Sequence, residues 1–180
     1  MAPLWTKSGG ISVVENAFAH YSRIYLGGIP SLIADESAFL AFICILSGIE
    51  ALGNYCYRDK SPGSRFKKFV KSYFAKPYPE YADSLWKFRN SLVHAFSTGE
   101  FVLTHHNSFV HFETNRIDEH DANEKEKIIL NAEDFYCALL MASQKFFAEV
   151  RNNGELKAHL IDRLKQEAGG QLRITPLRII

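Results

Sequence analysis

The chain has 180 residues, of which 47% are hydrophobic and 23% are charged, and its formal net charge is +1. This size and composition are typical of one globular domain with a sizeable core, so we expect residues 1–180 to form a single domain. The near-zero net charge excludes a polycation, and any attraction for nucleic acid has to come from a local patch of the surface.

Several features of the sequence predict a cytoplasmic protein. The first ten residues, MAPLWTKSGG, lack the basic region and apolar run of a secretory signal peptide. The longest uncharged run, residues 37–49, has 13 residues, whereas about 20 are needed to cross a bilayer, so we expect no membrane partner. The three cysteines form no CxxC pair, and their odd number favours a reducing compartment.

Apolar residues with helical spacing predict an N-terminal helix over about residues 11–26, which Gly27-Gly28 and Pro30 bring to an end.

A second helix is predicted from an N-cap at Asp35 to about Tyr57. Its residues are apolar on nearly every side, and its single interior charge is Glu50. A helix without a polar face is typically buried, so we expect this helix at the centre of the fold.

Two amphipathic helices are predicted next. Over residues 64–75, aromatic and apolar residues recur at positions i, i+3, i+4, i+7 and i+8, and basic residues cover the opposite side. Residues 76–79 interrupt the pattern, and Pro79 suits the first turn of a helix that continues to about Ser97. On a helical wheel, the apolar face of this last helix consists of Leu85, Phe88, Leu92 and Phe96.

The apolar period then changes to the alternation of β-strands. Residues 101–106 and 109–114 predict an antiparallel hairpin on a two-residue turn at Asn107-Ser108. A charged connector, residues 115–127, follows, and residues 128–130 predict a third short strand.

Two further helices are expected after the strands. Asn131 as an N-cap, followed by an acidic first turn, predicts a helix to about Val150, and a last helix is predicted over about residues 155–168. The sequence therefore predicts a mainly α fold, a bundle of four to six helices with a small antiparallel β-hairpin or three-stranded insertion. Its core is expected to span about residues 35–150.

Arg89 is the least expected side chain of the predicted helix over residues 79–97, because it projects from the apolar side. A guanidinium cannot lose its charge, so a buried one needs a carboxylate or phosphate partner. Asn90 and His94 lie on the polar face one helical turn apart, and an imidazole can move a proton near neutral pH. This combination indicates a site rather than a core position.

The segment Arg89-Asn90-Ser91-Leu92-Val93-His94 has an arginine, then a polar residue, and a histidine five positions after the arginine. It resembles the motif of the HEPN superfamily of helical ribonucleases. The upstream buried helix with a lone glutamate and the β insertion before the next long helix are also similar, and the resemblance covers roughly residues 35–150. Toxin members paired with nucleotidyltransferase antitoxins can carry a modifiable tyrosine two residues after the histidine; Phe96 at that place excludes this modification.

The resemblance implies a homodimer whose two motifs face each other across a cleft, and RNA cleavage by attack of the 2′-OH without a metal or a cofactor. His94 would move the proton, Arg89 would bind a phosphate oxygen, and Asn90 would orient the imidazole or contact phosphate. An activity in toxin, defence or stress contexts is expected with it, and an antitoxin or regulator as a possible partner.

Glu50 is expected to support this site by pairing with Arg89. Leaving either charge alone inside the bundle would cost about 3–5 kcal/mol. The alternative is that the two residues form a buried bundle pair with no chemistry.

A basic run forms the second candidate surface. Residues 58–76 contain seven Lys or Arg and one acid, interleaved with aromatic residues. We expect this patch to guide RNA phosphates toward a cleft. The candidate side chains are Arg58, Arg65, Lys67, Lys68 and Lys71. The alternative is that the aromatic residues belong to the core and the lysines are merely solvated.

A metal site is not expected. His106, His111 and Glu113 share one face of the predicted hairpin, but no fourth ligand follows at a recognisable spacing, and no HExxH pattern occurs. Two other function classes stay open. One is a non-catalytic helical module that binds RNA or a nucleotide through residues 58–76; the other is a dimerisation protein in which the Glu50–Arg89 pair is architectural only.

Overall fold

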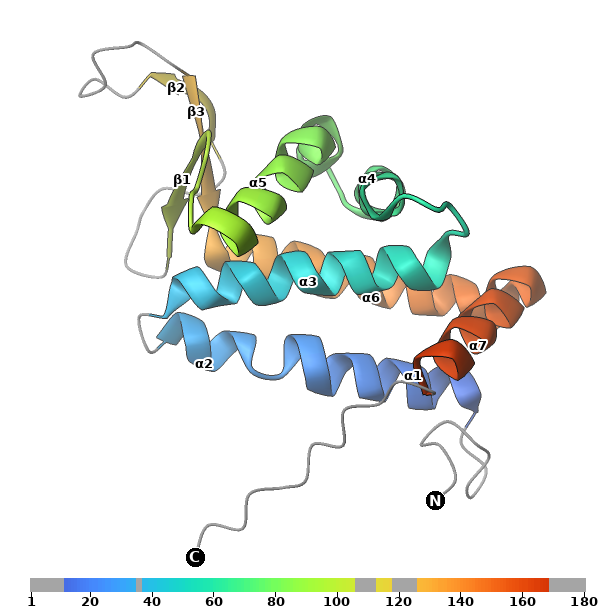
Figure 1. The fold of residues 1–180 in the computed structure, drawn as a ribbon. Coiled ribbons are helices and arrows are strands. Elements are labelled where there is room, and N and C mark those ends of the chain that lie inside the picture. Colours follow the sequence, from blue (N-terminus) through green and yellow to red (C-terminus); the bar gives the residue numbers. More distant parts are fainter. Residues whose placement is uncertain (1–11, 35–36, 106–112, 118–125, 169–180) are drawn as a thin grey trace, which may run out of the picture.

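The computed structural model describes residues 12–34, 37–105, 113–117 and 126–168. Helices lie in layers, with a small sheet at one end and the last helix across the other end (Figure 1). The elements are α1 (Val13–Tyr21), the π-helix η1 (Ser22–Leu26), α2 (Ile29–Ala34), α3 (Ala38–Cys56), α4 (Pro62–Tyr73), the 3-10 helix η2 (Tyr78–Tyr81), α5 (Ala82–Ala95), β1 (Phe101–Thr104), β2 (Glu113–Ile117), β3 (Glu126–Asn131), α6 (Ala132–Asn152) and α7 (Gly154–Ala168). The predicted mainly α fold is confirmed.

Helix α3 runs through the middle of the bundle, as its apolar sequence predicts. It lies between the layer of α1 and α2 and the layer of α4 and α5, with α6 beside it (Figure 1). Its side chains Phe42, Ile45 and Ile49 are at most 1% exposed. The predicted N-cap, Asp35, lies outside the described residues.

One window of α3, Phe39–Cys56, is the single segment of the described chain that is long and apolar enough to cross a membrane. Half of this window is buried inside the bundle. The central helix of a globular fold has this composition because neighbouring elements surround it.

The helices around α3 meet in an aromatic core. The ring of Phe135 on α6 lies 6.4 Å from that of Phe42 on α3 and 5.5 Å from that of Tyr78 in η2. Phe69 of α4 packs edge-on against Phe146 of α6 at 5.9 Å. Each such ring buries about 150–250 Å² of surface. These contacts therefore supply much of the apolar burial that holds α4 and α6 on α3.

The predicted helix over residues 11–26 is present as two consecutive helical elements and ends at Leu26. Helix α1 gives way to the π-helix η1, and a further short helix, α2, begins at Ile29. Pro30 lies in the first turn of α2, where the N–H that proline lacks would have no partner within the helix. The proline therefore starts a helix here instead of ending one.

The three strands form one sheet in the order β1-β3-β2. β1 is parallel to β3, with Phe101 opposite Ile128, and β2 is antiparallel to β3, with Ile117 opposite Glu126. The predicted pairing of residues 101–106 with residues 109–114 is not confirmed, because the neighbour of β1 is β3.

The position of β3 has a physical reason. Ile128, Ile129 and Leu130 are at most 9% exposed, and so apolar a run is best buried as the middle strand. The sequence predicts a connector over residues 115–127, but strand β2 extends into this segment. The predicted turn, Asn107-Ser108, lies outside the described residues.

The two C-terminal helices agree with the prediction. The side chain of Asn131 caps α6 by accepting a hydrogen bond from the backbone N–H of Asp134 at 3.1 Å. Asn153 separates α6 from α7 and accepts bonds from the N–H groups of Glu155 and Leu156, each at 3.1 Å. Helix α7 then packs across the ends of α3 and α6 (Figure 1).

Candidate functional site

Helix α5 carries the predicted motif and is anchored by its apolar face. Leu85, Phe88 and Leu92 are at most 2% exposed, and this part of the predicted face is confirmed. Phe96 is the exception: it is 75% exposed, because the helix ends at Ala95 and does not continue to residue 97. The helical wheel places Phe96 on the apolar side only if the helix reaches it.

Arg89 and Glu50 form the ion pair that the sequence predicts. Nη2 of Arg89 lies 2.6 Å from Oε2 of Glu50, and the side chains are 21% and 22% exposed. Nη1 of Arg89 donates to Oδ1 of Asn90 at 3.3 Å, and the guanidinium lies 5.6 Å from the ring centre of Trp86. These contacts fix the plane of the guanidinium at the boundary between core and solvent.

One polar atom of this cluster stays without a hydrogen bond. Nε of Arg89 is buried and has no acceptor among the described residues. A buried N–H of a charged group is costly to leave unsatisfied, so an oxygen atom brought to this side of Arg89 would be favoured.

His94 lies in the last turn of α5 and is exposed. It follows Asn90 by one helical turn, so the two side chains are neighbours on the surface of α5. Within the described chain, His94 makes no hydrogen bond or ion pair with Arg89, and the two side chains leave the helix about 140° apart. The fold thus brings Arg89, Asn90 and Glu50 together and leaves His94 on the adjacent open face.

The basic side chains of α4 are already engaged with carboxylates. Nζ of Lys67 lies 2.7 Å and Nζ of Lys71 lies 3.6 Å from the carboxylate of Asp83, while Lys68 lies 2.8 Å from Asp59. The ion pair with Lys68 lowers the pKa of Asp59, and that with Lys67 lowers the pKa of Asp83, so both acids are ionised at neutral pH. These acids offset part of the positive charge of the patch.

Arg65 has a structural position. Its Nε donates to Oδ1 of Asn54 at 2.6 Å, and its Nη1 donates to the carbonyls of Asp59 and Lys60. These bonds hold the link between α3 and α4. Arg58 in the same link is exposed, as are Lys68 and Lys71.

A shallow groove of about 340 Å³ runs along the lysine side of α4. Its lining residues are Ser61, Gly63, Ser64, Lys67, Lys68, Lys71 and Trp86. Since Trp86 also touches Arg89, this groove and the Arg89 cluster share one indole ring.

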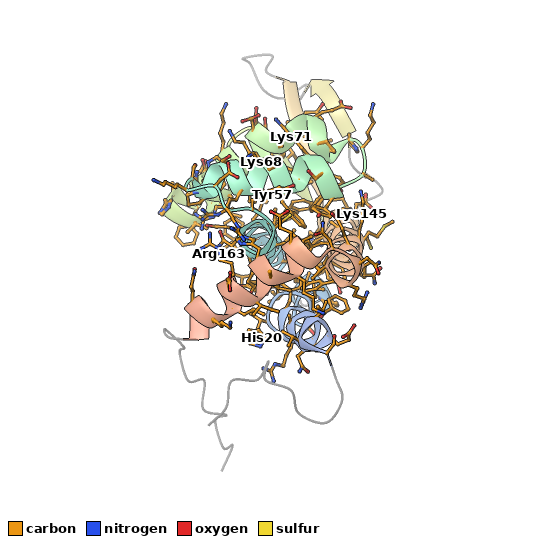
Figure 2. The ribbon with its side chains drawn as sticks, turned by 90° about the vertical axis from the view of Figure 1, so that its right-hand side faces the viewer. His20, Tyr57, Lys68, Lys71, Lys145 and Arg163 are labelled. Carbon is orange, nitrogen blue, oxygen red and sulfur yellow. The ribbon has the colours of Figure 1, made fainter. Side chains whose placement is uncertain are left out.

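A larger pocket, of about 520 Å³, opens at the other end of the bundle, between α3, α4, α6 and α7. Tyr57, Lys68 and Lys145 all lie at this end of the molecule (Figure 2). The hydroxyl of Tyr73 donates to Oε2 of Glu149 at 2.8 Å, and the hydroxyl of Tyr57 donates to Oγ of Ser72 at 2.8 Å.

Burial changes the acid–base behaviour of the pocket. It raises the pKa of Tyr57 to about 12 and also raises the pKa values of Tyr73 and of the Cys56 thiol, so these groups stay protonated at neutral pH. His159, which is 7% exposed, has its pKa lowered by burial, and its Nε2 has no hydrogen-bond partner among the described residues. Neutral hydroxyl, thiol and imidazole groups therefore line the pocket together with the side chains of Arg58, Lys145, Glu149 and Glu155.

The sequence does not predict this pocket. Tyr73 lies on the apolar face of its helix, which predicts a core residue, and Glu149 lies 76 positions away along the chain. The sequence signal available was the interruption at Asn153, which brings α7, with His159, back over the end of α3.

No group of three or more His, Cys, Asp or Glu side chains in the described part of the chain is placed to hold a metal ion. His106 and His111, which share one face of the predicted hairpin, lie outside the described residues.

Comparisons of the chain with models of known protein families, with curated proteins and with solved structures find no match. The resemblance of the motif on α5 to the HEPN superfamily therefore stays a prediction.

Proposed function

We propose that the protein is a metal-independent endoribonuclease of the HEPN type, with Arg89, Asn90 and His94 in its site. The observation that carries this proposal is the arrangement on α5. An arginine is held by Glu50 and Asn90 at the edge of the core, and a titratable histidine is exposed one turn after Asn90.

The proposed reaction needs one base and one acid. The 2′-oxygen of a ribose attacks the adjacent phosphorus while a base takes its proton, and the bond from phosphorus to the 5′-oxygen breaks as that oxygen receives a proton. The products are a 2′,3′-cyclic phosphate and a 5′-hydroxyl. His94 serves in these proton transfers, because a neutral imidazole accepts a proton and an imidazolium donates one near neutral pH.

Arg89 stabilises the charge that develops on the phosphate oxygens. Its guanidinium cannot lose its charge, and its fixed plane suits two parallel hydrogen bonds to a phosphate. Glu50 holds that plane, and the buried Nε without a partner is a free donor of the same group.

The proposed active form is a homodimer. Arg89 and His94 diverge by about 140° around α5, so a single phosphate is best reached by Arg89 of one protomer and His94 of the other. The α4 lysines would approach RNA from the groove, and Arg58 would approach it from the larger pocket, which it lines. We place the protein in the cytoplasm, in a toxin, defence or stress role, with an antitoxin or regulator as the expected controlling partner.

The test is RNA cleavage in EDTA, with structured and unstructured RNA as substrates. We expect His94→Ala to lower the cleavage rate by about 10²–10⁴-fold, the usual contribution of a positioned acid–base group. Lys87→Ala, an exposed change on the same helix, is the matched control and should cleave at the normal rate. Circular dichroism verifies the fold of both variants. Equal rates for His94→Ala and the unchanged protein would exclude this role.

A second candidate function is a non-catalytic module for dimerisation or for RNA or nucleotide binding. The observation that favours it is the 2.6 Å contact by which Glu50 offsets the charge of Arg89. This alternative predicts no cleavage by any variant, together with unfolding of Arg89→Ala, because Glu50 would lose its partner.

A further inference from the structure

Phe96 has an unusual backbone conformation and an unusual exposure. It caps the C-terminus of α5 with φ at 49°, in the left-handed region, and its side chain is 75% exposed. Glycine or asparagine normally occupies such a cap, and a bulky residue there is a conformational outlier. Outliers of this kind gather at functional sites, where the side chain has a use that offsets the strain.

The ring of Phe96 is supported from behind. It stacks on the ring of Phe39 at the start of α3, with 6.2 Å between the ring centres and 25° between the planes. The backbone N–H groups of Phe96 and Ser97 both donate to the carbonyl of Ser91, which fixes the end of the helix. The result is a flat aromatic surface that is held in place on one side and open on the other.

This surface lies close in the chain to His94, to which the proposed function assigns the proton transfers. Phe96 follows His94 by two residues. Unpaired bases in RNA are commonly bound by stacking on exposed aromatic rings, whereas bases inside a duplex are already stacked and offer no free face.

Among the described residues of α3 and α5, few large apolar side chains are exposed beside Phe96. Apart from Phe96, the exposed apolar neighbours on α3 and α5 are Leu40 and Val93, at 49% and 38% exposure. A stable interface buries about 800 Å² on each partner. One open ring bordered by polar and small residues offers a stacking surface of the size of a single base.

We propose that Phe96, supported by Phe39, is a stacking subsite for an unpaired nucleobase beside the scissile phosphate. The substrate class is therefore single-stranded RNA or an unpaired loop. This inference rests on the proposed function, in which Arg89 and His94 act on that phosphate.

The probe is a single-stranded 2′-O-methyl oligonucleotide that carries one 2-aminopurine. It cannot be cleaved by 2′-OH attack, and its fluorescence falls when the base stacks. We expect the unchanged protein and Phe96→Trp to bind it with quenching and to bind the matching duplex more weakly. Phe96→Asn should weaken the binding by about 5–150-fold and lose the quenching, in line with the usual 1–3 kcal/mol per stacked base.

Two controls distinguish a stacking role of Phe96 from a structural role of the same side chain. Met141→Ala removes another exposed apolar side chain, 66% exposed on α6, and should bind normally. The Tm of Phe96→Asn should equal or exceed that of the unchanged protein, since asparagine suits the left-handed region. A lowered Tm, or a sedimentation mass that falls from dimer to monomer with Phe96→Asn, would instead assign Phe96 to packing or to an interface and overturn the proposal.

The outcome also distinguishes this inference from the proposed function. Cleavage of ordinary RNA that depends on His94 but not on Phe96 would retain the nuclease and reject the subsite. Quenched binding that depends on Phe96, without cleavage by any protein tested, would retain the subsite and reject the nuclease. Equal binding of single strand and duplex would reject the subsite directly.

Discussion

Nη2 of Arg89 on α5 and Oε2 of Glu50 on α3 lie 2.6 Å apart at the boundary between core and solvent. The two helices belong to different layers of the bundle, so the contact ties them together and orients the guanidinium (Figure 1). Because each side chain is about four-fifths buried, the loss of either partner leaves a poorly solvated charge.

We expect Glu50→Gln and Arg89→Met each to lower the free energy of unfolding by about 3 kcal/mol, the lower end of the range for buried pairs, since both side chains keep some solvent. The double variant Glu50→Gln with Arg89→Met should recover most of this loss, because no charge is left unpaired. Urea unfolding followed by circular dichroism measures all three. Additive losses in the double variant would show that the two charges do not act as a pair.

Removal of one acid should reveal the phosphate-binding capacity of α4. Asp83→Asn frees Lys67 and Lys71, and because Asp83 is 62% exposed the free energy of unfolding should change by less than about 1 kcal/mol. Single-stranded RNA should bind more tightly, and the slope of log affinity against log salt should steepen by about 0.7 for each lysine that gains a phosphate. Asp162→Asn makes the same charge change on α7. If it has an equal effect, the net charge and not the α4 surface is responsible.

The stability of the protein should depend on His159 below pH 6.5. Burial lowers the pKa of His159 in the folded state, so the unfolded chain takes up the proton first as the pH falls. The free energy of unfolding should therefore be constant for this group above about pH 6.5 and should fall below it, by at most about 1.4 kcal/mol per pH unit.

His159→Gln is the control for that titration. It removes the imidazole but keeps His20, whose pKa is also lowered by burial, so the difference between the two proteins isolates His159. Thermal unfolding at several values between pH 5 and pH 8 gives both curves. Parallel curves over this range would contradict the assignment.

A larger residue at Gly53 should destabilise the protein, because α4 packs directly on this glycine. A Cβ atom at Gly53 would lie 3.0 Å from the backbone carbonyl carbon and oxygen of Arg65, and backbone moves only with its helix. Gly53→Ala should cost about 1–3 kcal/mol of stability, as overpacking does. Gly28→Ala meets nothing within 4 Å and should keep or raise the stability. Equal Tm values for both variants would contradict the close packing of α4 on Gly53.

The central part of the site follows from the sequence for a physical reason. Periodicity places Arg89 on an apolar face and shows one acid, Glu50, inside the central helix, and a buried charge requires a partner of opposite sign. Local chemistry and burial therefore suffice to pair two residues that lie 39 positions apart, and the structure confirms the contact. The cap at Asn131 is likewise a local feature, because Asn131 and the N–H group that it caps lie within four residues of each other in the chain.

Features that depend on where a helix ends or on tertiary placement cannot be predicted from local sequence. Periodicity extends the apolar face of α5 to Phe96, but the helix stops one residue earlier, and no glycine marks that end. The partners of the α4 lysines depend on how η2 turns the chain to bring Asp83 beside α4. The pairing of β1 with β3 is also non-local, and alternation alone does not decide which strands are neighbours.

The sheet also links the two halves of the bundle mechanically. β1 begins at Phe101, shortly after α5 ends at Ala95, and β3 ends at Asn131, the residue that caps α6. The parallel ladder between β1 and β3 therefore connects the segment that follows α5 to the residue that caps α6. A displacement of β1 would have to break this ladder or carry the N-terminal end of α6 along with it.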